Sequence, residues 1–507
     1  MTGYLLGISL ALGSLVQGCL GTTLLSPITS CSSLTVTPPD GTTLINATAI
    51  ERYNVTYSLP TYNGVAGNVN VCDVEVFLTH GDAGDAVRFA IYLPLDGWNG
   101  RWQGTGGGGW AAGGFDFELV AAATSGYTAG ATDAGVNLEG KTEFWYNSTQ
   151  LNENFVYLSF HQMTLIGKDL SEKFYGKRPD YSYWFGCSQG GRQGMSEAQL
   201  YPEDYDGIFA GAPAISWEKV AVASYWPLAV QNQIGESIPL CKLDAIQQAS
   251  IAACDLLDGA ADGLISNPLK CDFNAIEVVG MQLQCDENTT ATITEQDAIV
   301  WNKIRTGLTD KEGSLLWYGL EPGTYNGALA TPGFDITTRW IADWLLQDPD
   351  ADVSNITENE LVEFFYQSVS ELGALWGTDN PDLSAFRERG GKIMTWHGWA
   401  DEIIPPLGTV DYWQRVVELA GGIESTDEFY RIFMAPGLGH CGSENSYGPQ
   451  IPIDNLAPLV EWVENGKAPE TIFFSGNGQT RNICKFPKEL VYCGSGDISD
   501  AASWECV

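Results

Sequence analysis

A serine set between glycines constrains the fold of this chain more than any other feature. Gly186-Cys187-Ser188-Gln189-Gly190 follows a short aromatic strand expected at 181–185 and precedes a helix expected at 189–201. Glycines on both sides let the backbone make the sharp, strained turn that exposes a nucleophilic serine. A bare G-x-S-x-G pattern is common, but the strand before it and the helix after it are the context this turn requires. The sequence therefore predicts a strand–turn–helix unit with Ser188 as the nucleophile.

The chain around this turn alternates between strand and helix patterns. The helix after Ser188 is followed by a strand expected at 205–211, and this order is typical of a doubly wound α/β unit. This alternation of strand and helix patterns is absent from residues 215–385, which are irregular and rich in Trp and Asp. It begins again near residue 390. We therefore predict an α/β-hydrolase core made of residues 19–214 and 386–507, with a lid domain inserted at 215–385.

A serine nucleophile needs a base, and the chain has four histidines. In α/β-hydrolases the chain order is serine, acid, histidine. His440, the last histidine, lies in a glycine-rich loop after a predicted strand and is the expected base. Asp401, at the end of an earlier strand, is the expected acid that orients the imidazole; its neighbour Glu402 is the alternative. His397 is expected near the site in a structural role.

Two cysteines adjoin the predicted catalytic residues. Cys187 directly precedes Ser188, and Cys441 directly follows His440. If the serine and the histidine meet, the two thiols meet as well. A disulfide between them would restrict the loop that carries the base.

The oxyanion of the reaction needs two N–H donors. One is expected from Gln189, the residue after the nucleophile. The other is expected from the glycine run that follows an early strand, from Gly107 or Gly108. No Lys-Ser/Thr follows these glycines, so a phosphate-binding loop is disfavoured.

An acidic loop at 255–265 has the composition of a calcium site. Asp255, Asp258 and Asp262 alternate with glycines that allow tight turns, and hard oxygen ligands suit calcium. The spacing is not that of an EF-hand. Cys254 and Cys271 flank the loop and would brace it. We expect a structural role, far from the chemistry; a solvated acidic turn is the alternative.

The net charge of −38 limits the partners of the chain. Such a surface repels nucleic acid and anionic lipid, so neither is expected to bind. Beyond the amino terminus, no apolar run is long enough to span a bilayer.

The amino terminus and the cysteines indicate secretion. Residues 1–18 form a short apolar run with small residues before a cleavage point, as in a secretory signal peptide. The chain has twelve cysteines and no C-x-x-C pair, so disulfides are expected rather than zinc. Five Asn-x-Ser/Thr sequons are typical of an extracellular glycoprotein; they begin at Asn46, Asn54, Asn147, Asn288 and Asn355.

These residues together resemble the tannase and feruloyl esterase family. Cys187-Ser188, Asp401 and His440-Cys441 are similar to the family's CS-D-HC motif. Gly190-Gly191-Arg192-Gln193-Gly194, a DxxDGxxDG loop opened by Cys254-Asp255, and the stretch 462–469 also match. The resemblance covers nearly the whole mature chain.

The resemblance implies a secreted serine carboxylesterase that cleaves esters of phenolic acids through an acyl-enzyme on Ser188, with small phenolic, plant cell-wall or tannin esters as substrates. Galloyl esters, the substrates of a tannase, are the alternative to feruloyl esters. A non-catalytic protein that binds polyphenols or glycans is a further class. It is disfavoured because neither the serine nor the histidine is replaced.

The resemblance also implies a structural calcium ion and a set of disulfides. The family's calcium ligands map to the carboxylates of Asp255, Asp258 and Asp262 and the carbonyls of Ala260 and Leu264. Family disulfides map to Cys484–Cys506 and Cys254–Cys271. The amino-terminal cysteines depart from the feruloyl esterase pattern; we expect Cys31–Cys72 there, Cys241–Cys285 then follows by elimination, and Cys19 and Cys493 stay unassigned.

Overall fold

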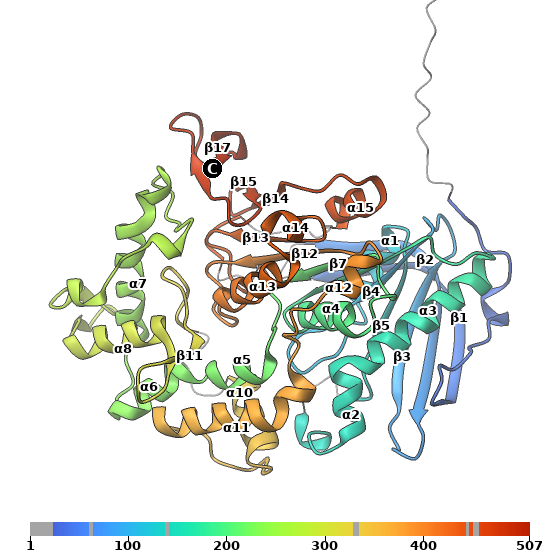
Figure 1. Cartoon of the computed structure of the whole chain (residues 1–507), viewed down its shortest axis with the longest axis horizontal. Helices are drawn as coiled ribbons and strands as arrows, with labels where there is room; N and C mark the ends of the chain where they lie inside the picture. The colour runs from blue at the N-terminus through green and yellow to red at the C-terminus, as the bar shows by residue number, and fades with distance from the viewer. Residues whose placement is uncertain (1–23, 60–63, 137–140, 328–333, 443–445, 450–455) are drawn as a thin grey trace, which may run out of the picture.

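A nine-stranded mixed sheet forms the centre of the molecule (Figure 1). The computed structural model describes residues 24–59, 64–136, 141–327, 334–442, 446–449 and 456–507, so the predicted signal peptide and Cys19 lie outside the described residues. Antiparallel pairing joins the first four strands in the sheet, and parallel pairing joins the rest. In sheet order the strands are β1 (Thr42–Leu59), β2 (Gly64–His80), β3 (Val87–Pro94), β5 (Thr128–Thr132), β4 (Arg101–Thr105), β6 (Tyr181–Cys187), β7 (Gly207–Gly211), β12 (Lys392–Gly398) and β13 (Tyr430–Ala435).

Helices cover both faces of this sheet. Side chains alternate between the faces along each strand, and each face packs into its own apolar cluster. In β6, for example, Trp184 lies in one cluster and Tyr183 in the other. The first cluster includes α3 (Ser159–Tyr175), α4 (Gln189–Leu200) and α13 (Pro406–Ala420); the second includes α1 (Phe117–Thr124) and α15 (Leu456–Asn465).

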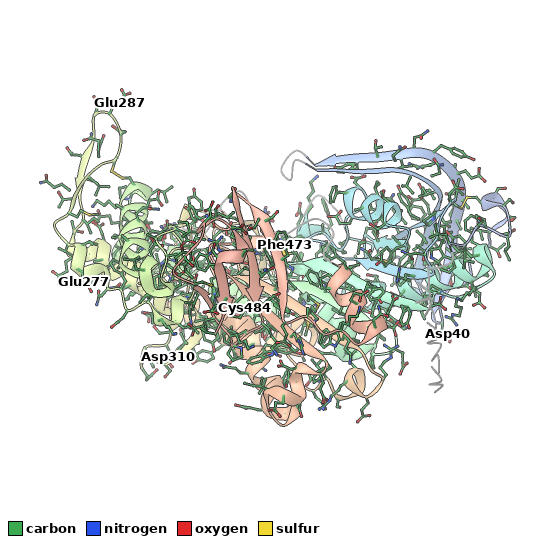
Figure 2. The ribbon with its side chains drawn as sticks, turned by 90° about the horizontal axis from the view of Figure 1, so that it is seen from above. Asp40, Glu277, Glu287, Asp310, Phe473 and Cys484 are labelled. Atoms are coloured by element: carbon green, nitrogen blue, oxygen red, sulfur yellow. A yellow bond between two sulfur atoms is a disulfide. The ribbon has the colours of Figure 1, made fainter. Side chains whose placement is uncertain are left out.

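An insertion between β7 and β12 contributes no strand to the nine-stranded sheet. It lies to one side of the sheet in Figure 1, and Figure 2 shows Glu277 and Glu287 at its far end. Its α-helices within the described residues are α5 (Trp217–Ala223), α6 (Trp226–Ile234), α7 (Leu240–Cys254), α8 (Glu295–Thr306), α10 (Asp335–Arg339), α11 (Glu358–Trp376) and α12 (Ser384–Glu388). Its two hairpins are β8 (Gln282–Gln284) with β9 (Thr290–Thr292), and β10 (Gly307–Thr309) with β11 (Leu315–Tyr318).

Disulfides link segments within the core and within the insertion. The described residues contain five, and they are the five expected pairs: Cys31–Cys72, Cys187–Cys441, Cys241–Cys285, Cys254–Cys271 and Cys484–Cys506. Cys493 is a free, exposed thiol. Among the described helices, none is both long enough and apolar enough to cross a membrane.

Beyond the insertion, the carboxyl-terminal part adds two short hairpins. They are β14 (Thr471–Gly476) with β15 (Gln479–Cys484), and β16 (Leu490–Tyr492) with β17 (Trp504–Cys506). In Figure 1 these hairpins lie next to β13, the last strand of the sheet, and a bridge joins Phe433 of β13 to Lys485. The Cys484–Cys506 disulfide joins the two hairpins.

Candidate active site

Ser188 occupies the turn between β6 and α4. Its backbone has φ 62° and ψ −120°, a strained conformation for a residue with a side chain. The Ser188 N–H donates to Gly211 O at the end of the neighbouring strand β7, 2.9 Å away, which fixes the turn. A Cβ on Gly186 would lie 2.6 Å from the carbonyl carbon of Gly190, so this close passage of the backbone requires glycine. The local sequence therefore folds into the strained turn that the glycines predicted.

Asp401 and His440 meet after the ends of β12 and β13. His440 Nδ1 lies 2.8 Å from Asp401 Oδ2, and Asp401 is fully buried. The other carboxylate oxygen, Oδ1, accepts the N–H groups of Ile403 and Ile404, at 2.9 and 2.8 Å. With Nδ1 directed at the carboxylate, Nε2 is the ring nitrogen left to exchange a proton with a substrate or nucleophile.

Each member of this pair favours the charged form of the other. Burial alone would raise the pKa of Asp401, but the nearby His440, hydrogen bonds from both imidazoles and the charge of His397 lower it. Burial alone would lower the pKa of His440, but the charge and hydrogen bond of Asp401 and the charge of Glu402 raise it above its ordinary value. The carboxylate therefore stays ionised and stabilises an imidazolium.

Glu402 and His397 support the pair from two sides. Glu402 Oε2 accepts the backbone N–H of His440 at 2.9 Å, so this carboxylate holds the loop, whereas Asp401 contacts the imidazole. His397 is fully buried, and its Nε2 lies 3.0 Å from Asp401 Oδ2, the oxygen that also faces His440. Its Nδ1 lies 2.9 Å from Thr409 Oγ1. The acid thus has two histidine partners.

The Cys187–Cys441 disulfide joins the serine turn to the histidine loop. The two Cα atoms are 6.0 Å apart, and the bond closes a sequence separation of 254 residues. Ser188 and His440 each adjoin one of the bonded cysteines. His440 Nε2 is 3.6 Å from Cys441 Sγ, so this face of the imidazole lies against the disulfide. Ser188, Asp401 and His440 therefore lie at one edge of the sheet, at the carboxyl ends of β6, β12 and β13 respectively.

The glycine run after β4 lies against the start of α4. Gly107 does not serve as a free donor, because its N–H donates to the side-chain oxygen of Gln193, 3.1 Å away. The sequence left Gly107 and Gly108 as alternatives, and this bond favours Gly108 as the candidate donor. The N–H of Gly108 has no hydrogen-bond partner among the described residues, and Gly108 is exposed. Gln189 is the first residue of α4, where a backbone N–H has no partner within the helix.

The acidic loop at 255–265 holds its carboxylates in hydrogen bonds. Asp262 pairs with the buried Arg481 at 2.6 Å, Asp258 accepts from Ala260 N–H and Ser266, and Asp255 accepts from two loop N–H groups. Within the described residues, no group of three or more His, Cys, Asp or Glu is arranged to hold a metal ion. The carboxylates of the loop therefore have hydrogen-bond partners within the loop and, for Asp262, in Arg481. A carboxylate that accepts an N–H group keeps further lone pairs that could bind a cation.

The loop is closer to the chemistry than the sequence suggested. A Cβ on Gly437, three residues before His440, would lie 2.5 Å from Leu264 Cδ2. Leu264 and Gly437 also line a small shared hollow with Trp399 and Ala400, which precede Asp401. The prediction of a remote loop is therefore wrong, because the insertion folds back onto the segments that carry the acid and the base.

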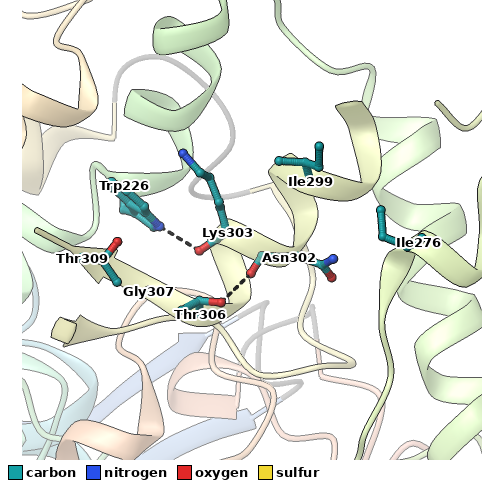
Figure 3. A pocket seen from close by; sticks show the side chains of 8 residues that line it. All are labelled: Trp226, Ile276, Ile299, Asn302, Lys303, Thr306, Gly307 and Thr309. Carbon is teal, nitrogen blue, oxygen red and sulfur yellow. Dashed lines mark hydrogen bonds between the residues drawn. The ribbon is translucent and has the colours of Figure 1, made fainter. Parts of the chain in front are cut away.

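A separate hollow of about 260 Å³ lies on the insertion (Figure 3). Trp226 Nε1 donates to Lys303 O at its edge, and Lys303 Nζ pairs with Glu358. None of the predicted site residues lines it; its lining is Trp226, Ile276, Ile299, Asn302, Lys303, Thr306, Gly307 and Thr309. We do not assign the reaction to this hollow.

Comparison with known proteins defines the family. The profile described as "Tannase and feruloyl esterase" matches residues 72–507. This chain belongs to the tannase and feruloyl esterase family. The family consists of carboxylic ester hydrolases, so the substrate is an ester.

Individual relatives resemble the chain over nearly its whole length. A "Probable feruloyl esterase" of Arthroderma benhamiae is 40% identical over 502 residues, covering 94% of this chain and 93% of the relative. The structure of a tannin acyl hydrolase from Aspergillus niger matches with a TM-score of 0.82 at 28% identity, covering 93% of each chain. Feruloyl esterase B from Aspergillus oryzae matches with a TM-score of 0.80 at 26% identity, covering 94% of this chain and 99% of that one.

The contacts of two residues beside the site were not predicted from the sequence. Gln193 bonds to the glycine run, and His397 bonds to the acid. Gln193 belongs to the motif that follows the nucleophile, which indicated that it lies near the site. Nothing in the sequence indicated its hydrogen bond to Gly107. His397 was placed near the site, and its bond to Asp401 depends on the turn after β12.

Proposed function

We propose that this chain is a secreted serine carboxylesterase of the α/β-hydrolase fold that cleaves esters of phenolic acids. One observation carries the proposal: an Asp401–His440 pair is linked by a disulfide to the strained turn that holds Ser188. Three separate segments thus supply nucleophile, acid and base in the chain order expected for this chemistry.

The reaction proceeds in two halves. His440 Nε2 removes the proton from Ser188, whose oxygen attacks the ester carbonyl, while Asp401 stabilises the imidazolium. The N–H groups of Gln189 and Gly108 bind the developing oxyanion. His440 then protonates the leaving alcohol. Water, activated by the same imidazole, frees the acid from the acyl-enzyme.

The inserted segment supplies the lid that covers the site. Its support is an aromatic contact: Trp110, two residues after Gly108, stacks on Trp344 of the insertion with ring centres 4.9 Å apart and planes 7° apart. Trp340 and Trp376 of the insertion also contact Trp110. A lid joined in this way to the oxyanion loop would exclude water and grip a phenolic ring.

Substrate choice lies between two related esters. Feruloyl esters are favoured by the 40% identical relative, and galloyl esters are the second candidate because the tannin acyl hydrolase has a closely similar structure. A galloyl ring needs hydrogen-bonding partners for three hydroxyl groups, whereas a methoxylated ring needs apolar room. The ratio of kcat/KM for methyl ferulate to that for methyl gallate distinguishes them. Hydrolysis of neither ester would refute the phenolic-ester proposal.

Secretion and glycosylation accompany this function. All five sequon asparagines are exposed, and five disulfides are typical of an oxidising compartment. A structural calcium ion in the 255–265 loop stays a proposal. Its support is the local charge, since the loop brings together Asp255, Asp258 and Asp262, and Arg481 forms an ion pair with Asp262.

Replacing the nucleophile tests the proposal directly. Ser188→Ala should lower kcat on methyl ferulate by about a million-fold, because no other group forms the acyl-enzyme. Ser370→Ala, an exposed hydroxyl on α11, is the matched control and should leave kcat unchanged. Circular dichroism and Tm should match the wild type for both variants. Full turnover by a folded Ser188→Ala variant would refute the serine mechanism.

A further inference from the structure

A buried glutamine bridges both ends of the glycine loop. Gln193 lies on α4 with no exposed surface. Its Nε2 donates to Ala112 O at 2.9 Å, and its Oε1 accepts the Gly107 N–H at 3.1 Å. One partner is a donor and the other an acceptor, so only an amide in this orientation satisfies both.

The same loop touches α4 through its backbone. The Gly190 N–H donates to Gly107 O at 2.8 Å. A Cβ on Gly106 would lie 2.5 Å from Gly190 Cα and 2.9 Å from Gln193 Oε1. The first turn of the nucleophile's helix and the entry to the glycine loop are therefore in contact without intervening side chains.

Gly108 lies inside the segment that Gln193 bridges. The Ala111 N–H donates to Gly108 O at 3.0 Å, which closes a tight turn around it. The Gly108 N–H has no partner among the described residues, and a Cβ on Gly108 would meet nothing within 4 Å. The loop thus has both ends bonded to α4 and one free amide on an open side.

We propose that Gln193 is a positioning residue, which fixes the 107–112 loop so that the Gly108 amide can bind the oxyanion. This inference rests on the proposed serine esterase function. Because Gln193 and Ser188 are on the same turn and helix, nucleophile and oxyanion donors share one rigid support. Gln193 does not touch the substrate; it acts through Gly107 and Ala112.

Another glutamine on the same helix offers a matched control. Gln199 Nε2 donates to Thr378 O at 2.9 Å and to Tyr412 Oη at 3.0 Å, so this side chain also makes two hydrogen bonds. It has no contact with the glycine loop. Gln193→Met and Gln199→Met remove the same chemistry at similar volume, and only the first frees the loop.

The test compares transition-state and ground-state binding. Phenylboronic acid is the transition-state probe: the Ser188 oxygen adds to boron, His440 takes its proton, and a boron-bound oxygen occupies the oxyanion position. Ground-state affinity is measured with methyl ferulate, by calorimetry, in a Ser188→Ala background with and without Gln193→Met. Values of kcat and KM for methyl ferulate complete the set.

Gln193→Met should lower kcat by about 10- to 100-fold and weaken phenylboronic acid binding by a similar factor, with KM and ground-state affinity changed less than about 3-fold. Gln199→Met should leave both kcat and boronic acid affinity within about 3-fold of the wild type. Wild-type kcat in Gln193→Met, or an equal loss in both variants, would overturn the proposal. Should Gln193→Met not fold, Gln193→Glu, which keeps the acceptor for Gly107, is judged by the same criteria.

The outcomes separate this inference from the function on which it rests. If Ser188→Ala abolishes turnover and Gln193→Met does not lower kcat, only the positioning role fails. If Ser188→Ala retains turnover, the serine mechanism itself fails.

Discussion

Removing the Cys187–Cys441 disulfide should cost both stability and catalysis. The bond closes a separation of 254 residues, for which chain entropy predicts a loss of about 5 kcal/mol when both cysteines are replaced by serine. The Cys484–Cys506 bond spans 22 residues and predicts a loss of about 3 kcal/mol. The shorter bond is therefore the control, and the expected difference in the free energy of unfolding is about 2 kcal/mol.

The catalytic loss has a different origin. Without the disulfide, the loop of His440 is still held by the Asp401 side chain and by Glu402 on its backbone N–H. These contacts orient the imidazole but leave its distance to Ser188 free to vary. A misplacement of about 1 Å costs about 100-fold in rate, so kcat should fall by about 10- to 100-fold in the folded double variant.

Urea unfolding and steady-state kinetics measure the two effects separately. Both double-serine variants are compared with the wild type at 15 °C, where circular dichroism verifies that each is folded. We expect lower urea midpoints for both variants and a lower kcat for Cys187→Ser/Cys441→Ser alone. Wild-type kcat in that variant would refute the argument that the disulfide positions the base. Equal kcat losses in both variants would assign the effect to general loosening.

Two further outcomes follow from the charges near the site. Glu402→Gln removes a negative charge that raises the pKa of His440. Because catalysis needs the unprotonated imidazole, the acid limb of the pH profile of kcat/KM should move to lower pH. An unchanged or upward-shifted limb would contradict the effect of Glu402 on His440. Treatment with a chelator should lower Tm, and added Ca²⁺ should restore it, if the 255–265 loop binds calcium, because an ion that binds only the folded chain stabilises it. An equal Tm with chelator and with Ca²⁺ would refute calcium binding by this loop. Arg481 would then be the partner of Asp262.

The sequence alone determined the features that depend on residues adjacent in the chain. The glycines around Ser188 predict a strained turn because no larger residue fits where Gly186 passes Gly190. The positions of Cys187 and Cys441 beside the serine and the histidine predicted their disulfide, which the structure contains. Strands β6 and β7 were expected close to their observed bounds, because buried parallel strands have short, continuous runs of apolar residues.

Tertiary structure alone decided the features that depend on contacts between distant segments. The β1–β2 hairpin pairs Thr42–Leu59 with Gly64–His80, because strand pairing includes polar and exposed stretches that have no strand pattern of their own. Gly107 and Gly108 look alike in the sequence, and only the approach of Gln193 distinguishes them. Leu264 reaches Gly437 because the insertion folds back on the core. The spacing of residues in the sequence predicts the catalytic residue types and the local backbone geometry. Which of two similar neighbours, such as Gly107 and Gly108, takes a given role depends on packing partners that lie far away in the chain.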